Sequence, residues 1–147
     1  MGYFGSLDIS ASGLSAQRLR MDTISQNIAN VNTTRTENGT PYRRRIVLFE
    51  EKSLVAPFSE YLSDASRKEI SGGGVRVAKV IQDQSPFRKV YDPGNPDADA
   101  EGYVQMPNID VVTEMVNMIS ATRAYEANVT AINSSKSMAM KALDIGR

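Results

Sequence analysis

The side chains that most often carry enzyme chemistry are missing from this sequence. Its 147 residues include no histidine and no cysteine, which removes the usual general base near neutral pH, thiol nucleophiles, disulfides and Cys/His zinc sites. Seventeen acidic and seventeen basic residues cancel, so no overall field attracts nucleic acid or an anionic membrane. We therefore expect no enzymatic activity, no cofactor, no bound metal, no small-molecule substrate and no nucleic-acid partner.

One acidic stretch has the spacing of a metal site. Asp97, Asp99 and Glu101, followed by Gly102, match the first half of a calcium-binding loop. The position of its bidentate glutamate holds Asn108 instead, so a solvated acidic turn is the better interpretation. The prolines within 92–101 predict an extended loop, because proline fits neither a helix interior nor a central strand.

Three further motifs have ordinary structural explanations. The run Arg43–Arg45 cannot form one flat basic patch on a strand, because successive side chains alternate between faces; we expect it to pair with the acidic loop 92–101 or with a neighbouring subunit. Asn38–Thr40 matches both a glycosylation acceptor and a turn, and a turn is favoured. Ser71–Gly74 lacks the Lys-Ser/Thr ending of a phosphate-binding loop, which favours a hinge or bulge.

Two helices and a β-rich middle would position these residues. In 1–33, Leu7, Leu14, Met21 and Ile28 recur every seven residues, which predicts a helix. Its many small polar residues make that helix marginal unless it has a partner. In 34–107 the pattern changes toward period two.

The middle segment predicts a small sheet or a pair of hairpins. Strands are expected at 42–49, 75–81 and 87–91, where β-branched and aromatic residues are enriched. No apolar run is long enough to span a bilayer, and we expect no cleavable secretory signal at the N-terminus.

The segment 108–147 predicts the longest helix. Apolar residues continue along one row from Val111 to Leu143, Asn108 or Asp110 can cap its start, and Gly146 can end it. At roughly 1.5 Å per residue this helix would be roughly 55 Å long, against roughly 38 Å for the diameter of a globule of this chain length. Its apolar surface therefore needs other subunits to cover it.

The predicted fold class is α+β, mainly α. The helices 1–33 and 108–147 would form one helical domain, an elongated coiled-coil-like pair, with the β-rich insert 34–107 between them. Apolar residues of both rows and asparagines that could fix helix register are the candidate subunit-interface residues: Leu14, Met21, Ile24, Asn27, Ile28, Asn30, Val31, Met115, Met118, Tyr125, Asn128, Val129 and Ile132.

The motifs in these helices resemble a known family. The asparagine-rich stretch 24–33 is similar to the N-terminal motif shared by bacterial flagellar rod and hook subunits. The stretches 34–44, 102–110 and 114–128 resemble proximal-rod subunits in particular. One departure is Asn95, where a histidine is expected.

The resemblance implies a structural subunit of the flagellar basal-body rod. Such a subunit polymerises through its terminal helices into the drive shaft that carries torque from motor to hook, and it is required for motility. The implied partners are copies of itself, other rod subunits and the membrane-ring and export-gate base of the flagellum. The implied location is the basal body, reached by type III export without a cleavable signal, and direct membrane insertion is not expected.

Two other hypotheses about function stay open at this point. One is a wall hydrolase that uses two carboxylates such as Glu114 and Asp97, although its acids are scattered. The other is a cytoplasmic coiled-coil adaptor unrelated to flagella.

Overall fold

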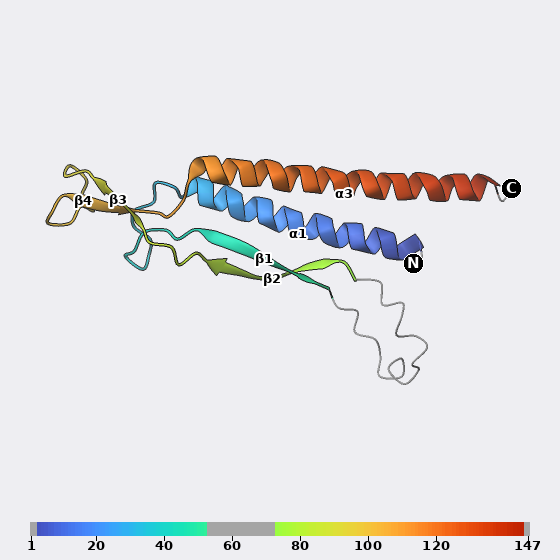
Figure 1. Ribbon diagram of the computed structural model, residues 1–147, viewed down its shortest axis with the longest axis horizontal. Coiled ribbons are helices and arrows are strands. Elements are labelled where there is room, and N and C mark those ends of the chain that lie inside the picture. Colours follow the sequence, from blue (N-terminus) through green and yellow to red (C-terminus); the bar gives the residue numbers. More distant parts are fainter. Residues whose placement is uncertain (1–2, 53–72, 146–147) are drawn as a thin grey trace, which may run out of the picture. The chain divides into compact units, whose positions relative to one another are not determined.

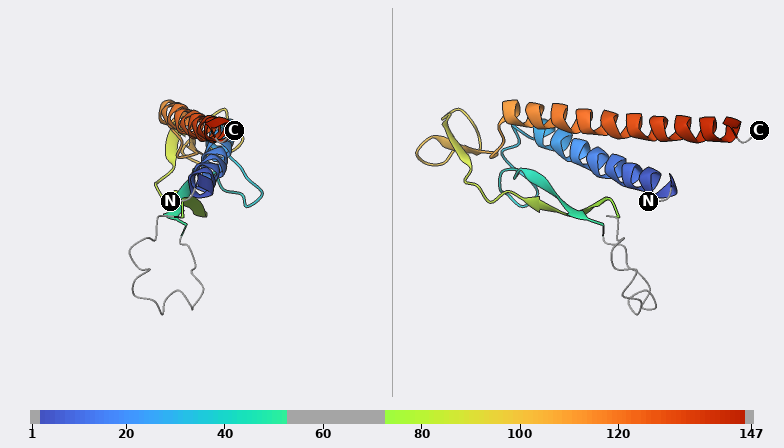
Figure 2. Two further views of the ribbon diagram at one scale, coloured as in Figure 1. Left: turned by 90° about the vertical axis from the view of Figure 1, so that its right-hand side faces the viewer. Right: turned by 45° about the vertical axis from the view of Figure 1, so that its right-hand side comes forward.

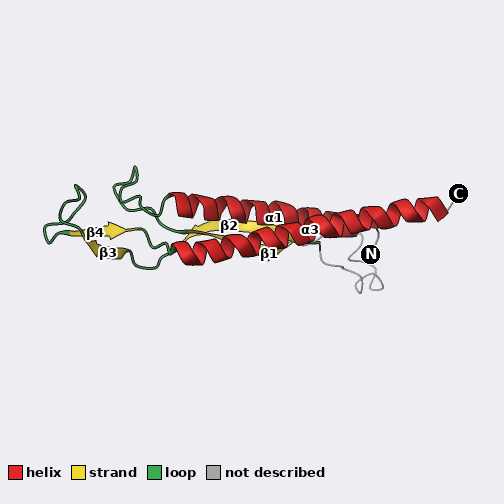
Figure 3. Cartoon of the chain, turned by 90° about the horizontal axis from the view of Figure 1, so that it is seen from above, coloured by secondary structure: helices red, strands yellow, loops and turns green. Residues whose placement is uncertain are grey.

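The computed structural model describes residues 3–52 and 73–145 (Figure 1). Within these residues two helices lie toward the ends of the chain, and two small two-stranded sheets lie between them in sequence. Figure 3 colours the helices red and the strands yellow. This arrangement confirms a mainly helical fold with a small β insert. The elements are α1 (Tyr3–Ala29), β1 (Arg45–Glu51), β2 (Val75–Gln82), β3 (Arg88–Tyr91), β4 (Tyr103–Met106) and α3 (Val111–Ile145).

The start of α3 is capped by Asp110. The backbone N–H of Thr113 donates to Asp110 Oδ2 at 3.2 Å, and the Thr113 hydroxyl donates to the same oxygen. These bonds satisfy donors that the first helical turn leaves unpaired, and the hydroxyl and amide of Thr113 lower the pKa of the Asp110 carboxyl. Of the two predicted caps Asp110 is therefore the one used; the predicted end at Gly146 lies outside the described residues.

The end of α1 comes at Ala29, four residues before the predicted boundary. Asn30 stops the helix with its side chain: Nδ2 donates to Gln26 O at 2.8 Å, and Oδ1 accepts from the Thr33 hydroxyl at 3.1 Å. The side chain thus adds a second hydrogen bond to the Gln26 carbonyl, which already accepts the Asn30 N–H at 3.1 Å, and closes a turn with Thr33.

The first sheet pairs β1 with β2, which lie side by side in both views of Figure 2. The N–H of Asp83, just after β2, donates to the carbonyl of Arg44, just before β1, at 2.8 Å, so the two strands are antiparallel. β1 begins three residues later than predicted, at Arg45. The residue before it is held instead by a side chain, because the Arg44 N–H donates to Asn108 Oδ1 at 2.9 Å.

The second sheet is an antiparallel hairpin. β3 pairs with β4 in a register that runs from Arg88 opposite Met106 to Tyr91 opposite Tyr103. The sequence analysis predicted β3 but no strand at β4, because a four-residue strand after the acidic segment gives little periodicity. The segment 92–101 is indeed a loop of turns. Within it Asp99 Oδ1 accepts the N–H groups of Glu101 and Tyr103 at 3.0 and 2.9 Å.

The chain divides into two compact units. In the unit formed by Leu19–Leu48 and Lys79–Ala121, the buried apolar residues are Ile24, Val104, Pro107, Ile109 and Ala121. Buried polar residues, Thr23, Asn27 and Glu114, lie in the same unit. Its core is therefore small and unusually polar.

The other unit comprises Met1–Arg18, Phe49–Ala78 and Thr122–Arg147. Here Ser12 Oγ accepts the N–H of Val75 at 3.1 Å and joins α1 to the start of β2. Gly13 lies against the side chain of Asn128, and a Cβ added at Gly13 would lie 2.9 Å from Asn128 Oδ1. The two helices of this unit thus meet at a residue without a side chain.

Two absences hold for the described part of the chain. No helix in 3–52 or 73–145 is both long enough and apolar enough to cross a bilayer. The same residues contain no cluster of three or more metal-binding carboxylates.

Gly74 tests the contact between α1 and β2. It has φ +90°, and an added Cβ would lie 2.3 Å from Ser12 Oγ, so Gly74→Ala combines backbone strain with a clash. We expect Gly74→Ala to lower the free energy of unfolding by about 2 kcal/mol or more, measured by urea denaturation followed by circular dichroism.

Gly39 is the matched control. It also has positive φ, +73°, but nothing lies within 4 Å of its added Cβ, so Gly39→Ala should cost only about 1 kcal/mol. Equal losses in the two variants would contradict the contact.

Candidate functional site

A buried carboxylate lies in the first turn of α3. Glu114 is 1% exposed. Arg44 donates to Glu114 Oε1 through Nε at 2.9 Å and Nη2 at 2.7 Å, and Asn27 Nδ2 donates to Oε2 at 2.9 Å. Both carboxylate oxygens are therefore bonded, which is the condition under which a charge is tolerated away from water.

Asn27 uses its whole amide. Nδ2 also donates to the carbonyl of Arg45 at 2.9 Å, while Oδ1 accepts the N–H of Arg45 at 2.9 Å and the hydroxyl of Tyr42 at 3.3 Å. The side chain pairs with both backbone groups of one residue, as a neighbouring strand would. It joins the end of α1 to the first residue of β1 and to α3.

Asn108 makes a second bridge. Its Oδ1 holds the N–H of Arg44, and its Nδ2 donates to the carbonyls of Asp83 and Ser85 at 3.2 and 3.3 Å. Arg43 Nη1 donates to the same two carbonyls, at 3.2 and 3.3 Å. The turn after β2 is thus fixed to the residues before β1 and before α3. We call Asn27, Arg44, Asp83, Asn108 and Glu114 the polar cluster.

Arg43 and Arg44 have partners outside the predicted loop 92–101, while the alternative prediction, a neighbouring subunit, stays a prediction. Arg44 pairs with Glu114 and also with Asp83 at 3.5 Å, so its predicted pairing with the loop 92–101 is wrong. Asn108 holds the backbone of Arg44 in place, and the guanidinium reaches α3. The guanidinium of Arg43 lies 4.2 Å from the ring centre of Phe87, a cation–π contact.

Hydrogen bonds from Ser85 stabilise the ionised form of Asp83. The Ser85 hydroxyl donates to Asp83 Oδ1 at 2.6 Å and the Ser85 N–H at 2.9 Å. These bonds, with a smaller contribution from Arg44, lower the pKa of Asp83. The carboxylate is therefore the favoured form beside the arginine.

An apolar face points away from the chain on the same part of α3. Val112, Met115, Val116 and Ile119 are 69, 54, 61 and 52% exposed. Val112, Val116 and Ile119 lie roughly 140–160° around the helix from Glu114 at about 100° per residue. We call these four residues the outward apolar face. Contiguous exposed apolar groups of this kind mark interaction sites.

The predicted interface residues fall into three groups. Ile24 and Asn27 are buried within the chain, at 5% and 1% exposure, whereas Met115 belongs to the outward apolar face. The others are partly exposed: Leu14, Met21, Ile28, Asn30, Val31, Met118, Tyr125, Asn128, Val129 and Ile132. The sequence analysis missed Val112, Val116 and Ile119, because it followed one apolar row along a helix that has apolar residues on two sides.

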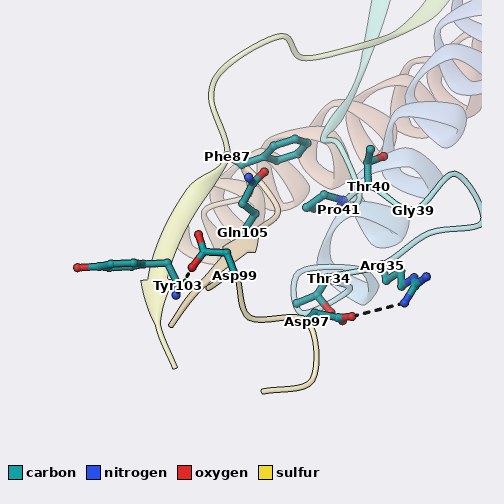
Figure 4. A pocket seen from close by; sticks show the side chains of 10 residues that line it. All are labelled: Thr34, Arg35, Gly39, Thr40, Pro41, Phe87, Asp97, Asp99, Tyr103 and Gln105. Atoms are coloured by element: carbon teal, nitrogen blue, oxygen red, sulfur yellow. Dashed lines mark hydrogen bonds and ion pairs between the residues drawn. The ribbon is translucent and has the colours of Figure 1, made fainter. Parts of the chain in front are cut away.

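A surface pocket of about 410 Å³ lies between the 34–41 segment and the β3–β4 hairpin (Figure 4). Its two carboxylates already have partners. Asp97 accepts from the Thr34 hydroxyl at 2.7 Å and lies 3.9 Å from the Arg35 guanidinium. Asp99 caps its own loop. Glu114 does not line this pocket, so Glu114 and Asp97, the two acids named for the wall hydrolase, do not flank this pocket together.

Comparison with known families matches both ends of the chain. Residues 7–35 match the family described as flagella basal body rod protein, and residues 100–145 match the family described as flagellar basal body rod FlgEFG protein C-terminal. The first match covers most of α1 and the turn after it. The second covers β4 and α3.

Full-length relatives identify the family more closely. The flagellar basal-body rod protein FlgC of Bacillus subtilis is 53% identical over 152 residues, covering 100% of both chains. The chain belongs to the FlgC family of flagellar basal-body rod proteins. FlgC of Borreliella burgdorferi is 50% identical over 99% of this chain and 98% of its own, and FlgC of Escherichia coli O157:H7 is 44% identical over 100% of both.

Membership in the FlgC family confirms the resemblance drawn from the sequence. FlgC proteins are structural subunits of the rod and not enzymes, which agrees with the expectation from composition. The hydrolase and the unrelated adaptor are therefore set aside.

Removing the buried carboxylate tests the polar cluster. Glu114→Ala leaves the Arg44 guanidinium and the Asn27 amide without their partner. We expect a loss of about 3 kcal/mol in the free energy of unfolding, the lower end of the range for a broken buried pair, because Arg44 is 24% exposed. Glu126→Ala, at an exposed position of the same helix, should change stability by at most about 0.5 kcal/mol. Similar effects in the two variants would rule out a structural ion pair.

The pH dependence of stability tests Asp83. A pKa lowered on folding contributes stability above the unfolded value of about 4, and this stability is lost as pH falls through the lowered pKa. The advantage of the parent chain over Asp83→Asn in the free energy of unfolding should therefore shrink between pH 5 and pH 2. Ser85→Ala, which removes the hydroxyl donor, should show a weaker dependence than the parent. A constant difference between parent and Asp83→Asn would contradict the assignment.

Proposed function

We propose that this chain is a structural subunit of the proximal rod of the flagellar basal body. In this role it polymerises with neighbouring rod subunits and carries torque from motor to hook, so it is required for motility. The observation that carries the proposal is the outward apolar face of α3 in a chain of the FlgC family.

The energetics support neighbouring subunits as the occupants of that face. Fully burying a valine, isoleucine or methionine is worth about 1.5–3 kcal/mol. Because the four side chains are only partly exposed in the chain alone, covering them contributes on the order of 1 kcal/mol each. A repeating assembly uses the contact in every subunit, so a modest gain per contact stabilises the whole polymer.

The last turns of α3 also expose apolar side chains, here on two opposite sides of the helix. Met138, Met140, Leu143 and Ile145 are 63, 59, 74 and 86% exposed. We infer that the terminal helices, including the predicted interface residues that are partly exposed, contact those of neighbouring subunits in a coiled-coil-like arrangement. The occupants would be copies of this chain, other rod subunits and, at the base, the membrane-ring and export-gate proteins.

The weak intrachain burial of α1 fits export and later folding. Among the residues of α1 whose burial is described, only Gly13, Ala16, Thr23, Ile24 and Asn27 are buried. Since helices depend mainly on packing of one face for stability, such a helix gains much of its stability on docking. We propose that the chain passes through the flagellar type III apparatus largely unfolded and orders fully in the basal body.

Replacing an outward side chain tests the proposal. Val116→Asp puts a charge on a position that is 61% exposed, so the isolated chain should keep its helical content, whereas a charge in a subunit contact is costly to desolvate. We expect strains carrying Val116→Asp to lose motility and their basal bodies to lack the chain, measured by swimming assays and immunoblots of isolated basal bodies. Val116→Leu, which keeps the face apolar, is the control and should remain motile. Normal incorporation of Val116→Asp would reject this face as a subunit contact.

A further inference from the structure

The start of α3 is apolar around most of its circumference. Seven of the eleven residues from Val111 to Ala121 are apolar. The side turned toward the chain carries Glu114 and the partly buried Asn117 together with the partly buried Met118 and the buried Ala121, whereas Val112, Val116 and Ile119 point outward. An ordinary amphipathic helix buries its most apolar side, whereas this one buries a side on which polar and apolar residues are mixed.

The hydrophobic effect does not choose this orientation. It is non-directional and scales with the apolar area removed from water, so turning α3 to bury Val112, Val116 and Ile119 would satisfy it at least as well. Something directional must hold the side that carries Glu114 inward in the isolated chain.

The polar cluster provides that direction. Four hydrogen bonds converge on the Glu114 carboxylate: two from the planar fork of Arg44, one from Asn27 and a long one, 3.5 Å, from Asn117 Nδ2. Bonds of this charge-assisted kind demand a defined geometry. A turn of α3 by one residue, about 100°, would carry the carboxylate away from Arg44 and Asn27 and leave buried groups unpaired.

We infer that Asn27, Arg44 and Glu114 are positioning residues that fix the rotation of α3 about its own axis and thereby keep the outward apolar face available to a neighbouring subunit. The consequence for assembly rests on the proposed function, but the rotation is a property of the chain alone. If the cluster only stabilised the fold, its removal would lower stability without changing which side of α3 is exposed.

The absence of cysteine allows a direct experiment on the full chain. Val116→Cys and Asn117→Cys each introduce a single thiol, one on the outward side and one on the inward side of α3. The rate of maleimide labelling, divided by the rate in denaturant, reports the exposure of each position. In the parent background we expect Val116→Cys to react at least tenfold faster than Asn117→Cys.

The test background is the double variant Arg44→Leu with Glu114→Leu. It removes both charges together, and replacing a buried ion pair by apolar residues leaves no unpaired charge, so we expect a folded, helical chain. In it Val116→Cys should react at least tenfold more slowly than in the parent, and Asn117→Cys at least tenfold faster. Arg44→Lys, which keeps the charge, should stay closer to the parent rates than Arg44→Leu.

The matched control is Arg123→Leu with Glu126→Leu, which removes one charge of each sign from exposed positions of α3 and should leave both rates unchanged. The inference is overturned if the double variant at Arg44 and Glu114 folds with unchanged labelling, or if it fails to fold. The proposed function is tested by a different experiment: normal incorporation of Val116→Asp into the rod would reject it. That outcome would not change the interpretation of the labelling rates.

Discussion

A charge that is removed from water must be bonded, and that requirement organises half of this chain. The Glu114 carboxylate, 1% exposed, draws Arg44 and Asn27 to itself, and through them the backbone of β1 and the end of α1. Asn108 extends the same network to the turn after β2. This unit has few buried apolar side chains. Its directional hydrogen bonds therefore fix one arrangement of its helices and strands, which hydrophobic burial alone would not do.

Contacts with neighbouring subunits explain why these apolar residues of α3 are exposed. A soluble monomer gains nothing from presenting Val112, Val116 and Ile119 to water while it buries a carboxylate on the opposite side of the helix. A subunit of a polymer does gain, because its partners supply the missing cover. Membership in the FlgC family of basal-body rod proteins and the outward apolar face of α3 therefore point to the same role by independent routes.

The sequence predicted the parts of the fold that depend on local pattern. Apolar periodicity predicted both helices, and capping chemistry gave Asp110 as one of two candidate caps of α3. The ends of β1, β2 and β3 were predicted to within three residues, whereas β4 was missed. The polar cluster did not follow, because Asn27 meets partners 18 and 87 residues away in the chain. Glu114 has the pattern of an exposed helix residue and Arg44 that of a strand surface. Only the tertiary structure shows that they are bonded to each other.

The most direct test of the central claim compares one thiol in two settings. Val116→Cys is labelled in the isolated chain and in basal bodies purified from a motile strain that carries the same substitution. If neighbouring subunits cover the outward apolar face, the thiol reacts rapidly in the isolated chain and is strongly protected in the basal body. Equal reactivity in both settings would contradict the account, because the face would then remain open to water in the assembled rod.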